Sequence, residues 1–479
     1  MMRSAPSILV LLTSSVLAGC AAVGPDFHPP AAPETPGYAM QGDAATGAGV
    51  AFGAPQAGPW WKDFGPPALD QVETQALGAS PTLAEADAAL DRARAALASV
   101  RSSLLPAIDS AASVQKDRIN LAAYGFNAAS LPGVSGNPEF TIYSVGLTAT
   151  YPLDIFGGQR RQIEGAAARA ASAARRGDAA ALTLTGQVAM AAVQTAGIRA
   201  EIAAVEAMIA DDRQTLELTR KAEAAGGEAE GARVSATTQL ARDEALLPPL
   251  RQMLTAARHQ LALLVGKAPA DWTPPDFDLA DFRAGAAPVA LPSELVHLRP
   301  DIQQAEADLH AATADVGVAT AALYPSISLI AGATQSTLTP GQILNAPSNA
   351  YNMGPSITAP IFDGGQLRAQ RRGAQAAARA SFAAYRQTVL SAFNQVADGL
   401  QALANDDAAV KAATHSEAAA LSNLALAQAA YRAGGSGLLP LIDAERQAGD
   451  ARRGRVTAET HRALDTVELI IASGARWKS

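Results

Sequence analysis

"RPDIQQAEADLHAATADVGVATAALYP" (299–325) decides the fold of this chain, because its pattern occurs twice. The earlier copy, "SPTLAEADAALDRARAALASVRSSLLP" (80–106), has matching prolines near each end and the same Ala-Glu-Ala-Asp near its start. Two more pairs follow in the same order: "DIFGGQRR" (154–161) with "IFDGGQLR" (361–368), and "AEAAGGEA" (222–229) with "YRAGGSGL" (431–438). Three matches in one order predict two structural repeats.

The spacing of apolar residues predicts a coiled coil in each repeat. No proline occurs from Gly157 to Ala225, and apolar residues recur there at alternating spacings of four and three. The second repeat keeps the same spacing from Val389 to Leu403. The positions in the first repeat are Leu184, Val188, Ala191, Thr195, Ile198, Ile202, Val205 and Ile209.

Glycine pairs predict where these helices reverse. The pairs at 226–227 and 434–435 interrupt the pattern, and a second helical stretch follows each pair. We expect long helices over 157–266 and 364–474. At about 1.5 Å per residue, the first helix alone would be about 100 Å long.

Four shorter stretches alternate between apolar and small polar residues. Such alternation is typical of strands with lipid on one side and water on the other. The pattern is clear from Tyr143 to Tyr151 and from Ile327 to Ala333, and it is weakest in the first stretch. The predicted strands cover about 107–118, 140–153, 326–335 and 352–362.

Four strands are too few to close a barrel with room inside. An isolated four-stranded sheet in hydrocarbon would also leave the N–H and C=O groups of its edges unpaired, at several kcal/mol each. Sharing strands between chains removes this cost, although the sequence does not fix the number of chains. The predicted fold is mostly α, with a long coiled-coil helical barrel and a shared trimeric 12-stranded membrane β-barrel that takes four strands from each protomer.

The N-terminus has the features of an exported lipoprotein. Residues 1–19 combine Arg3, an apolar stretch and small residues before a cleavage point, as a signal peptide does. "LAGC" (17–20) resembles a bacterial lipobox, which predicts a covalent lipid on Cys20, the only cysteine in the chain. The other interpretation is a free cysteine in an ordinary hydrophobic segment. Without a second cysteine, no disulfide can form within the chain.

Composition and motifs argue against several other functional classes of protein. The net charge of −8 gives no sign of nucleic-acid binding. No uninterrupted run of 18 apolar residues follows residue 20, so no transmembrane helix is expected. The six histidines are scattered without metal-ligand spacing, and no nucleophile–base pair is evident. The Asp211-Asp212 and Asp406-Asp407 pairs are interpreted as solvated helix faces. We expect neither an enzyme nor a cofactor beyond the lipid.

The predicted organisation follows from these features. The repeats are joined by a linker, and a Pro/Gly/Ala-rich strap connects the lipid to the packed body, which begins at Trp60. The segments are 1–19 (signal peptide), 20–59 (lipidated strap), 60–266 (first repeat), 267–290 (linker) and 291–479 (second repeat).

Several motifs resemble one family across nearly the whole mature chain. The chain resembles the TolC-like outer-membrane efflux proteins, in the NodT-type lipoprotein branch associated with resistance–nodulation–division (RND) pumps. The resemblance implies a homotrimer in the outer membrane that extends into the periplasm. It also implies two partners, a periplasmic adaptor (membrane fusion) protein and an inner-membrane RND-type pump. The matching motifs are "GCAAVGPDFHPP" (19–30), "WWKDFGPPALDQV" (60–72), "LPSELVHLRPDIQQAEADL" (291–309), "YPSISL" (324–329), "PIFDGGQLR" (360–368) and "YRAGGSGLLPLIDAER" (431–446).

The resemblance also implies a periplasmic aperture near the second glycine turn. Asp443 matches a family aspartate that forms a ring, Arg446 a nearby ion-pairing position and Leu439 an apolar constriction, and Tyr431 lies in the same motif. The chain departs from the family pattern at Pro440, where some relatives carry a second aspartate. The first-repeat turn offers only Glu228 and Glu230. The alternative is that Asp443 and Arg446 form an ordinary solvated pair.

The predicted function is a passive outer-membrane duct through which an energised pump expels small molecules. One alternative is a structural coiled-coil lipoprotein without a pore, which would need no alternating strands. A protein-secretion duct of the same fold is another, because the residues that shape a channel do not identify its cargo.

Overall fold

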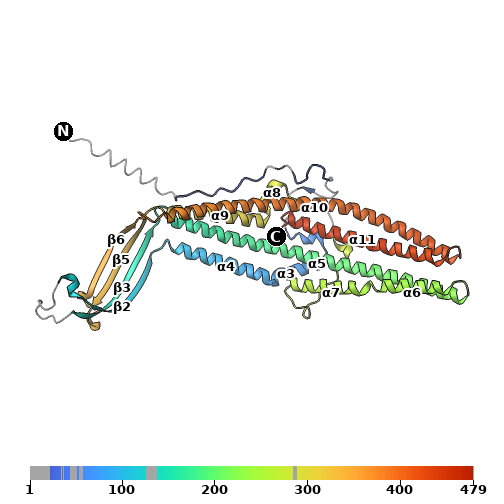
Figure 1. Ribbon diagram of the computed structural model, residues 1–479, viewed down its shortest axis with the longest axis horizontal. Helices are drawn as coiled ribbons and strands as arrows, with labels where there is room; N and C mark the ends of the chain where they lie inside the picture. The colour runs from blue at the N-terminus through green and yellow to red at the C-terminus, as the bar shows by residue number, and fades with distance from the viewer. Residues whose placement is uncertain are drawn as a thin grey trace. The chain divides into compact units, whose positions relative to one another are not determined.

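The computed structural model describes residues 22–33, 35, 37–43, 51–52, 58–125, 137–283 and 288–477 (Figure 1). The chain divides into two units that we treat separately. The sheet unit comprises Met1–Pro29, Asp91–Ala171 and Ala307–Ala383, and the helical unit comprises Pro30–Leu90, Ser172–Glu306 and Ala384–Ser479. The predicted signal peptide and Cys20 lie outside the described residues.

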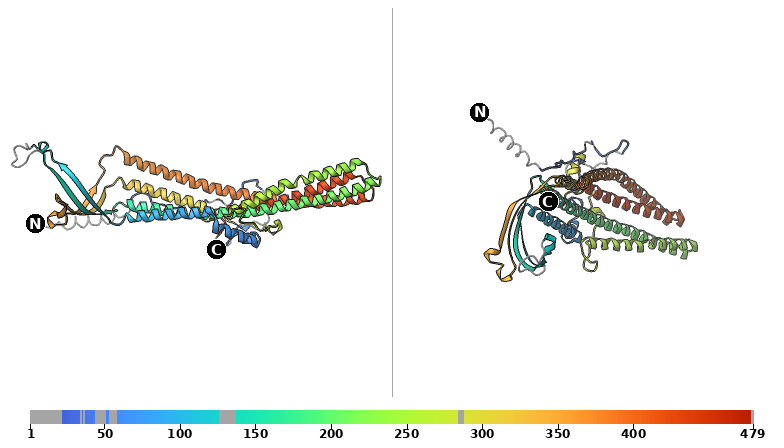
Figure 2. Two further views of the ribbon diagram at one scale, coloured as in Figure 1. Left: turned by 90° about the horizontal axis from the view of Figure 1, so that it is seen from below. Right: turned by 60° about the vertical axis from the view of Figure 1, so that its left-hand side comes forward.

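The sheet unit contains a four-stranded antiparallel sheet in the order β2-β3-β5-β6 (Figure 2). Each repeat contributes one pair of neighbouring strands, and the β3–β5 pairing joins the two repeats. Within the described part of the chain, β2 and β6 each pair on one side only. The strands are β2 (Ala107–Arg118), β3 (Glu139–Leu153), β5 (Ser326–Thr337) and β6 (Asn349–Thr358).

The strand register collects apolar side chains on one face of the sheet. Leu147 pairs with Ala333 on β5, which in turn pairs with Tyr351 on β6. Directly paired residues share a face, so the apolar positions of all four strands coincide. On this chain, Tyr351 and Met353 remain 81% and 78% exposed. The apolar positions are Ile108, Ala112, Val114, Tyr143, Val145, Leu147, Ala149, Tyr151, Ile327, Leu329, Ala331, Ala333, Tyr351, Met353 and Ile357.

The fourth strand differs from the predicted 352–362. It runs from Asn349 to Thr358, because the residues after it form the turn into the next helix. Pro360 has no N–H to donate to a ladder, and the Asp363 carboxylate accepts hydrogen bonds from the N–H groups of Gly365 and Leu367 at 2.8 and 2.7 Å. The first repeat uses Asp154 in the same way, accepting from Gln159 and Arg160 at 3.0 and 2.9 Å. The GGQ segments are therefore capped strand-to-helix turns.

The long helices α5 (Gly158–Ala224) and α10 (Gln366–Arg432) each contain 67 residues. Shorter helices, α4 (Pro81–Ser102) and α9 (Pro300–Ala321), precede the strands of each repeat. The helix that returns after the glycine turn differs between repeats. In the second it is one helix, α11 (Leu438–Ala472), whereas in the first it is divided into α6 (Glu230–Glu244) and α7 (Leu247–Leu264).

Of the helices predicted over 157–266, the return helix after the glycine turn is therefore divided in two. Pro248 and Pro249 account for the break between α6 and α7, since proline lacks an N–H and is tolerated only in the first turn of a helix. The second repeat is interrupted only at its glycine turn, between Arg432 and Leu438.

The main core lies in the helical unit. It takes its residues from the long helices and from α2 (Trp61–Phe64), α3 (Pro67–Ala79) and α8 (Pro292–Leu298). Two short parallel strands, β1 (Ala51–Phe52) and β4 (Pro288–Val289), join the strap to the linker in this unit. The fully buried side chains include Leu69, Leu261, Leu295, Ile302, Leu441 and Leu469.

One described helix, α5, is long and apolar enough to cross a membrane by length and composition. This result differs from the expectation of no such helix, which rested on the absence of an uninterrupted apolar run; in α5, polar residues such as Thr185 and Gln187 interrupt an otherwise apolar stretch. The buried α5 residues Val188, Ala192 and Val193 belong to the main core. Packing in the helical unit therefore accounts for the apolar character of this segment.

Two leucines on α7 give a matched test of the core. Leu261 is fully buried, whereas Leu263 is 67% exposed. We expect Leu261→Ala to lower the free energy of unfolding by about 2–5 kcal/mol, because it removes buried apolar contacts and leaves a cavity. Leu263→Ala should change it by less than about 0.5 kcal/mol. Denaturant unfolding followed by circular dichroism measures both, and equal losses would contradict this description of the core.

Candidate functional site

In each helical hairpin of the helical unit, a glycine turn joins the long helix to the helix that returns after it. After α5, Gly226 adopts φ +77°, and after α10, Gly434 adopts φ +71°. This left-handed backbone conformation favours glycine, which explains why both repeats place glycine here. The two turns lie at the same end of the unit (Figures 1 and 2). We call this end the tip.

Three of the predicted aperture residues share one exposed face of α11. Leu439, Asp443 and Arg446 are spaced by four and three positions, which places them on the same side of a helix. Leu439 is 71% exposed. Arg446 donates to Asp443 Oδ1 at 2.8 Å, and the Gln447 amide donates to Oδ2 at 2.7 Å. In the single chain, this face is open to solvent and carries an ion pair.

Tyr431 occupies a different environment. It lies at the end of α10, packed against a buried apolar cluster formed by α5, α6, α10 and α11. Its hydroxyl is buried and has no hydrogen-bond partner within the described residues. The structure thus separates Tyr431 from the exposed face of α11. We call the apolar cluster the tip core; its buried members are Leu216, Ala236, Leu424, Leu438, Leu441, Ala444 and Ala448.

The first-repeat turn carries a local ion-pair network. Arg233 on α6 lies 3.0 Å from a carboxylate oxygen of Glu223 on α5 and 3.2 Å from one of Glu230. The side chains of Arg233 and Glu223 are only partly exposed, whereas that of Glu230 is largely exposed, so the Arg233–Glu230 pair contributes at most about 1 kcal/mol. This turn has no counterpart of Asp443.

Three carboxyl groups are buried near the tip core, where sequence reasoning expected none. Asp212 on α5, Asp243 on α6 and Glu445 on α11 are only 4%, 7% and 7% exposed. The interpretation of Asp211-Asp212 as a solvated face is therefore wrong for Asp212. It follows Val205 and Ile209 at the next coiled-coil position, and that spacing could have indicated its burial.

The hydrogen bonds of these acids link three helices, and we call the three residues the acid layer. The carboxyl groups of Asp212 and Asp243 lie close enough for Asp243 to raise the pKa of Asp212. The Thr215 hydroxyl donates to Glu445 Oε1 at 2.6 Å, and the Gln239 amide donates to Asp243 Oδ2 at 3.1 Å. Asp212 Oδ2 and Glu445 Oε2 are buried without a partner in the structure as described.

Burial shifts two members of the acid layer, Asp212 and Glu445, toward their neutral forms. Burial, followed by the hydrogen bond and the charge of Asp243, raises the pKa of Asp212 to about 8. Burial also raises the pKa of Glu445 to about 7, although the Thr215 hydrogen bond opposes this shift. A second carboxyl pair joins α10 to α11, where burial and a hydrogen bond from Asp465 raise the pKa of Asp406 to about 6.

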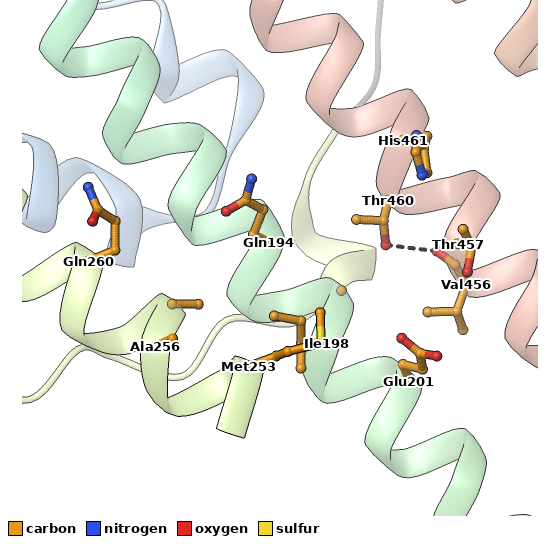
Figure 3. A pocket seen from close by; sticks show the side chains of 12 residues that line it. Gln194, Ile198, Glu201, Met253, Ala256, Gln260, Val456, Thr457, Thr460 and His461 are labelled. Atoms are coloured by element: carbon orange, nitrogen blue, oxygen red, sulfur yellow. Dashed lines mark hydrogen bonds between the residues drawn. The ribbon is translucent and has the colours of Figure 1, made fainter. Parts of the chain in front are cut away.

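An open groove of about 610 Å³ lies between α5, α7 and α11 (Figure 3). Three of the polar side chains drawn there make hydrogen bonds or ion pairs. The Thr457 and Thr460 hydroxyls donate to backbone carbonyls of their own helix at 3.0 and 2.8 Å, and Glu201 accepts from Arg453 at 2.7 Å. Both threonine hydroxyls therefore bond back to α11.

In the sheet unit, a buried arginine fastens the strap to the body. Arg161 on α5 is 5% exposed. It donates to Asp26 at 2.6 Å and to Glu164 at 2.7 Å. Glu164 also bonds to His310 on α9 at 2.9 Å, and the Phe27 ring stacks on His310 at 4.3 Å. We call these contacts the strap clasp.

Electrostatics and close packing favour this arrangement. The Arg161 hydrogen bond and charge lower the pKa of Asp26. Partial burial would raise the pKa of Glu164, but hydrogen bonds from Arg161 and His310 lower it overall. The strap and α9 also pass very close to each other at Gly24 and Gly317. A Cβ on Gly24 would lie only 2.5 Å from the backbone of Gly317. Sequence reasoning missed the clasp, since its residues are far apart along the chain.

The sequence pattern of the family described as "Outer membrane efflux protein" matches residues 73–267 and 291–475. The chain belongs to this family.

Individual relatives match over almost the whole length of the efflux protein. Nodulation protein T of Rhizobium leguminosarum bv. viciae is 29% identical over 98% of this chain and 92% of its own length. The pyoverdine export outer membrane protein OpmQ of Pseudomonas aeruginosa is 28% identical over 88% of each chain. The solved structure of the outer-membrane channel OprN has a TM-score of 0.85 and 30% identity, and the match covers 95% of this chain and 100% of that one.

The family match covers both the strands of the sheet and the helical hairpins. The efflux protein is an outer-membrane protein with the mixed helical and four-stranded architecture of its structural relatives. Both matched segments contain one strand pair and one helical hairpin, so each repeat is one copy of the family unit.

The strap clasp gives a test by proteolysis. In the efflux protein, Arg161→Met keeps an unbranched aliphatic stem but removes the guanidinium and its bonds to Asp26 and Glu164. We expect cleavage after Phe27 by chymotrypsin to become about tenfold faster, because charge-assisted bonds hold this segment. Asp43→Asn is the control, since its carboxylate bonds within its own turn. Unchanged cleavage in Arg161→Met would show that the clasp does not hold the strap.

Proposed function

We propose that this protein is the exit duct of a tripartite efflux system, conducting small molecules passively across the outer membrane. The observation that carries the proposal is the four-stranded sheet, which combines an exposed apolar face with two edges that are each paired on one side only. A sheet with these properties suits contact with lipid on one face and pairing with other strands at its edges.

A homotrimer is the assembly that we propose. In hydrocarbon, the edges of β2 and β6 need partners, because unpaired backbone groups cost several kcal/mol each. The edge strand β2 of one chain can pair with β6 of the next, which makes a closed ring. Since each chain contributes four strands, three chains supply twelve. A barrel of this size has room inside, unlike the packed eight-stranded kind.

The exposed face of α11 is the proposed aperture. In a threefold assembly, three copies of Asp443 would form a ring, with Leu439 and Arg446 on the same face. A ring of carboxylates in a narrow passage raises the local negative potential and favours cations. We assign Tyr431 a packing role at the tip core, where its ring contacts the cluster.

We propose no catalytic activity for the duct. The threonine hydroxyls of the groove already donate to their own helix. The only covalent group that we propose is the lipid on Cys20, which would anchor the mature chain to the outer membrane. The clasp supports this proposal, because it holds residues just after Cys20 against the body.

The proposed partners are a periplasmic adaptor and an inner-membrane RND-type pump. The printed names of the relatives include export and efflux-pump outer membrane proteins, which supports a role in such a system. We place substrate selection in the pump, since the groove and the tip offer no enclosed specific pocket among the described residues. Crosslinking in cells followed by purification should recover the pump and the adaptor.

Two alternatives remain distinguishable. A membrane-spacing lipoprotein without a pore would not need an apolar sheet with open edges, and it would give no conductance in liposomes. A protein-secretion duct would conduct, but its crosslinked partners would belong to a secretion system and not to a small-molecule pump.

Conductance with aperture variants tests the duct. Purified protein in planar bilayers should conduct and prefer cations. Asp443→Ala should reduce the cation preference several-fold, because it removes a ring of negative charge. Arg446→Ala, which leaves Asp443 unneutralised, should increase the preference. Both residues are exposed and their pair contributes little to stability, so folding should survive. Absence of conductance in all three proteins would exclude the duct.

Cys20→Ser tests the anchor. We expect the mature wild-type chain to carry a mass consistent with acylation at Cys20 and the variant to lack it. The variant should also be released more easily from membranes by mild washing. An unmodified Cys20 in protein purified from outer membranes would contradict the lipid proposal.

A further inference from the structure

The acid layer is the strongest unexplained feature of the described residues. Three buried carboxyl groups from α5, α6 and α11 meet between helices where apolar side chains are the rule. A buried carboxylate is costly unless a cation or several hydrogen bonds compensate it. The layer therefore needs either a counter-charge or protons.

The neighbouring charges do not supply that counter-charge. On α5, Asp211 also faces the layer and adds negative charge, and the cation acting on it is Arg452 of α11. Arg452 itself lies 3.6 Å from Glu417 of α10. The other nearby arginines have carboxylate partners outside the layer: Arg213 of α5 pairs with Glu244 of α6, and Arg446 of α11 pairs with Asp443.

We propose that the acid layer is a proton-controlled latch for the tip hairpins. Protons on Asp212 and Glu445 hold α6 and α11 against α5, with Asp243 as the neighbour of Asp212 on α6, and loss of these protons to solvent loosens both helices.

The closeness of two buried carboxyl groups explains how protonation holds the latch. Asp212 and Asp243 can hydrogen-bond to each other only while at least one proton lies between them. When that proton leaves, two like charges face each other in a buried site and repel. Asp212 Oδ2 and Glu445 Oε2, which lack protein partners, would then require water. Because the layer is closed to solvent, water can reach these oxygens only if the helices separate.

The direction of the pH dependence follows from the raised pKa values. The pKa of Asp212 rises from 3.8 to about 8, and that of Glu445 from 4.5 to about 7. The folded tip thus binds more protons than the unfolded chain between these values. The stabilisation from these protons is full below the ordinary pKa values of 3.8 and 4.5, decreases as the pH rises above them, and is lost as the pH passes through the raised values of about 7 and 8.

The latch connects to the aperture through α11. Glu445 lies two residues after Asp443, with Glu445 buried and Asp443 exposed on the other side of the helix. Loosening α11 would therefore move the exposed face that carries Leu439, Asp443 and Arg446. This connection rests on the proposed function, whereas the latch itself concerns only the packing of three helices.

Hydrogen–deuterium exchange of the full-length protein at about pH 5.5 and about pH 8.5 tests the latch. After correction for the intrinsic pH dependence of exchange, protection of α6 and of the first turns of α11 should fall about tenfold or more at the higher pH. Asp212→Asn cannot ionise and keeps a hydrogen-bonding side chain, so its protection should change several-fold less. Glu445→Gln, which can still accept from Thr215, should act in the same direction.

Glu217→Gln is the matched control. Glu217 lies five residues after Asp212 on α5, but its side chain is 57% exposed and pairs with Lys221. It should retain the wild-type pH dependence. Equal corrected protection of the wild-type tip at both pH values would overturn the latch, as would a wild-type pH dependence in both folded acid-layer variants. Exchange requires no conductance, so failure of the duct proposal would appear separately, in the bilayer measurement.

Discussion

The architecture depends on one requirement, that backbone N–H and C=O groups be paired wherever water is absent. Within the described residues, strands β3 and β5 each pair with a neighbouring strand on both sides, whereas β2 and β6 each pair on one side only. The strand register produces an apolar face that favours contact with lipid. In lipid, the unpaired backbone N–H and C=O groups at the sheet edges have no water to bond to and are therefore costly. A single chain is thus suited to be one part of a shared wall. The long helices face no such requirement, since their backbone bonds are internal.

The two repeats have equivalent turns but place different acidic residues at the tip. Asp154 and Asp363 cap equivalent strand-to-helix turns, and Gly226 and Gly434 reverse equivalent hairpins. The second repeat alone carries the exposed Asp443 face on an uninterrupted return helix. The first repeat supplies two of the three buried acids and a return helix divided near Pro248. The tip therefore combines an exposed charged face from one repeat with a buried titratable layer built largely by the other.

Part of the site could be predicted from the sequence, and the reasons for success and failure are physical. The exposed set at 439, 443 and 446 was predictable because helical spacing alone puts these residues on one face. Tyr431 was grouped with them because it is close in sequence, yet the turn at Gly434 places it against the tip core. Asp212 was misinterpreted because two adjacent aspartates resemble a solvated face. Its burial depends on α6 and α11, which are distant in sequence.

By itself, the sequence determined the repeats, the alternation of the strands, the coiled-coil spacing and the glycine turns, because each is a local pattern imposed by backbone geometry. Only the tertiary structure decided which side chains lose contact with water. It fixed the strand register that unites the apolar face, the burial of the acid layer and the meeting of Arg161 with Asp26 and His310. These features arise where segments far apart in the chain come into contact, and no local pattern encodes the environment that such a contact creates.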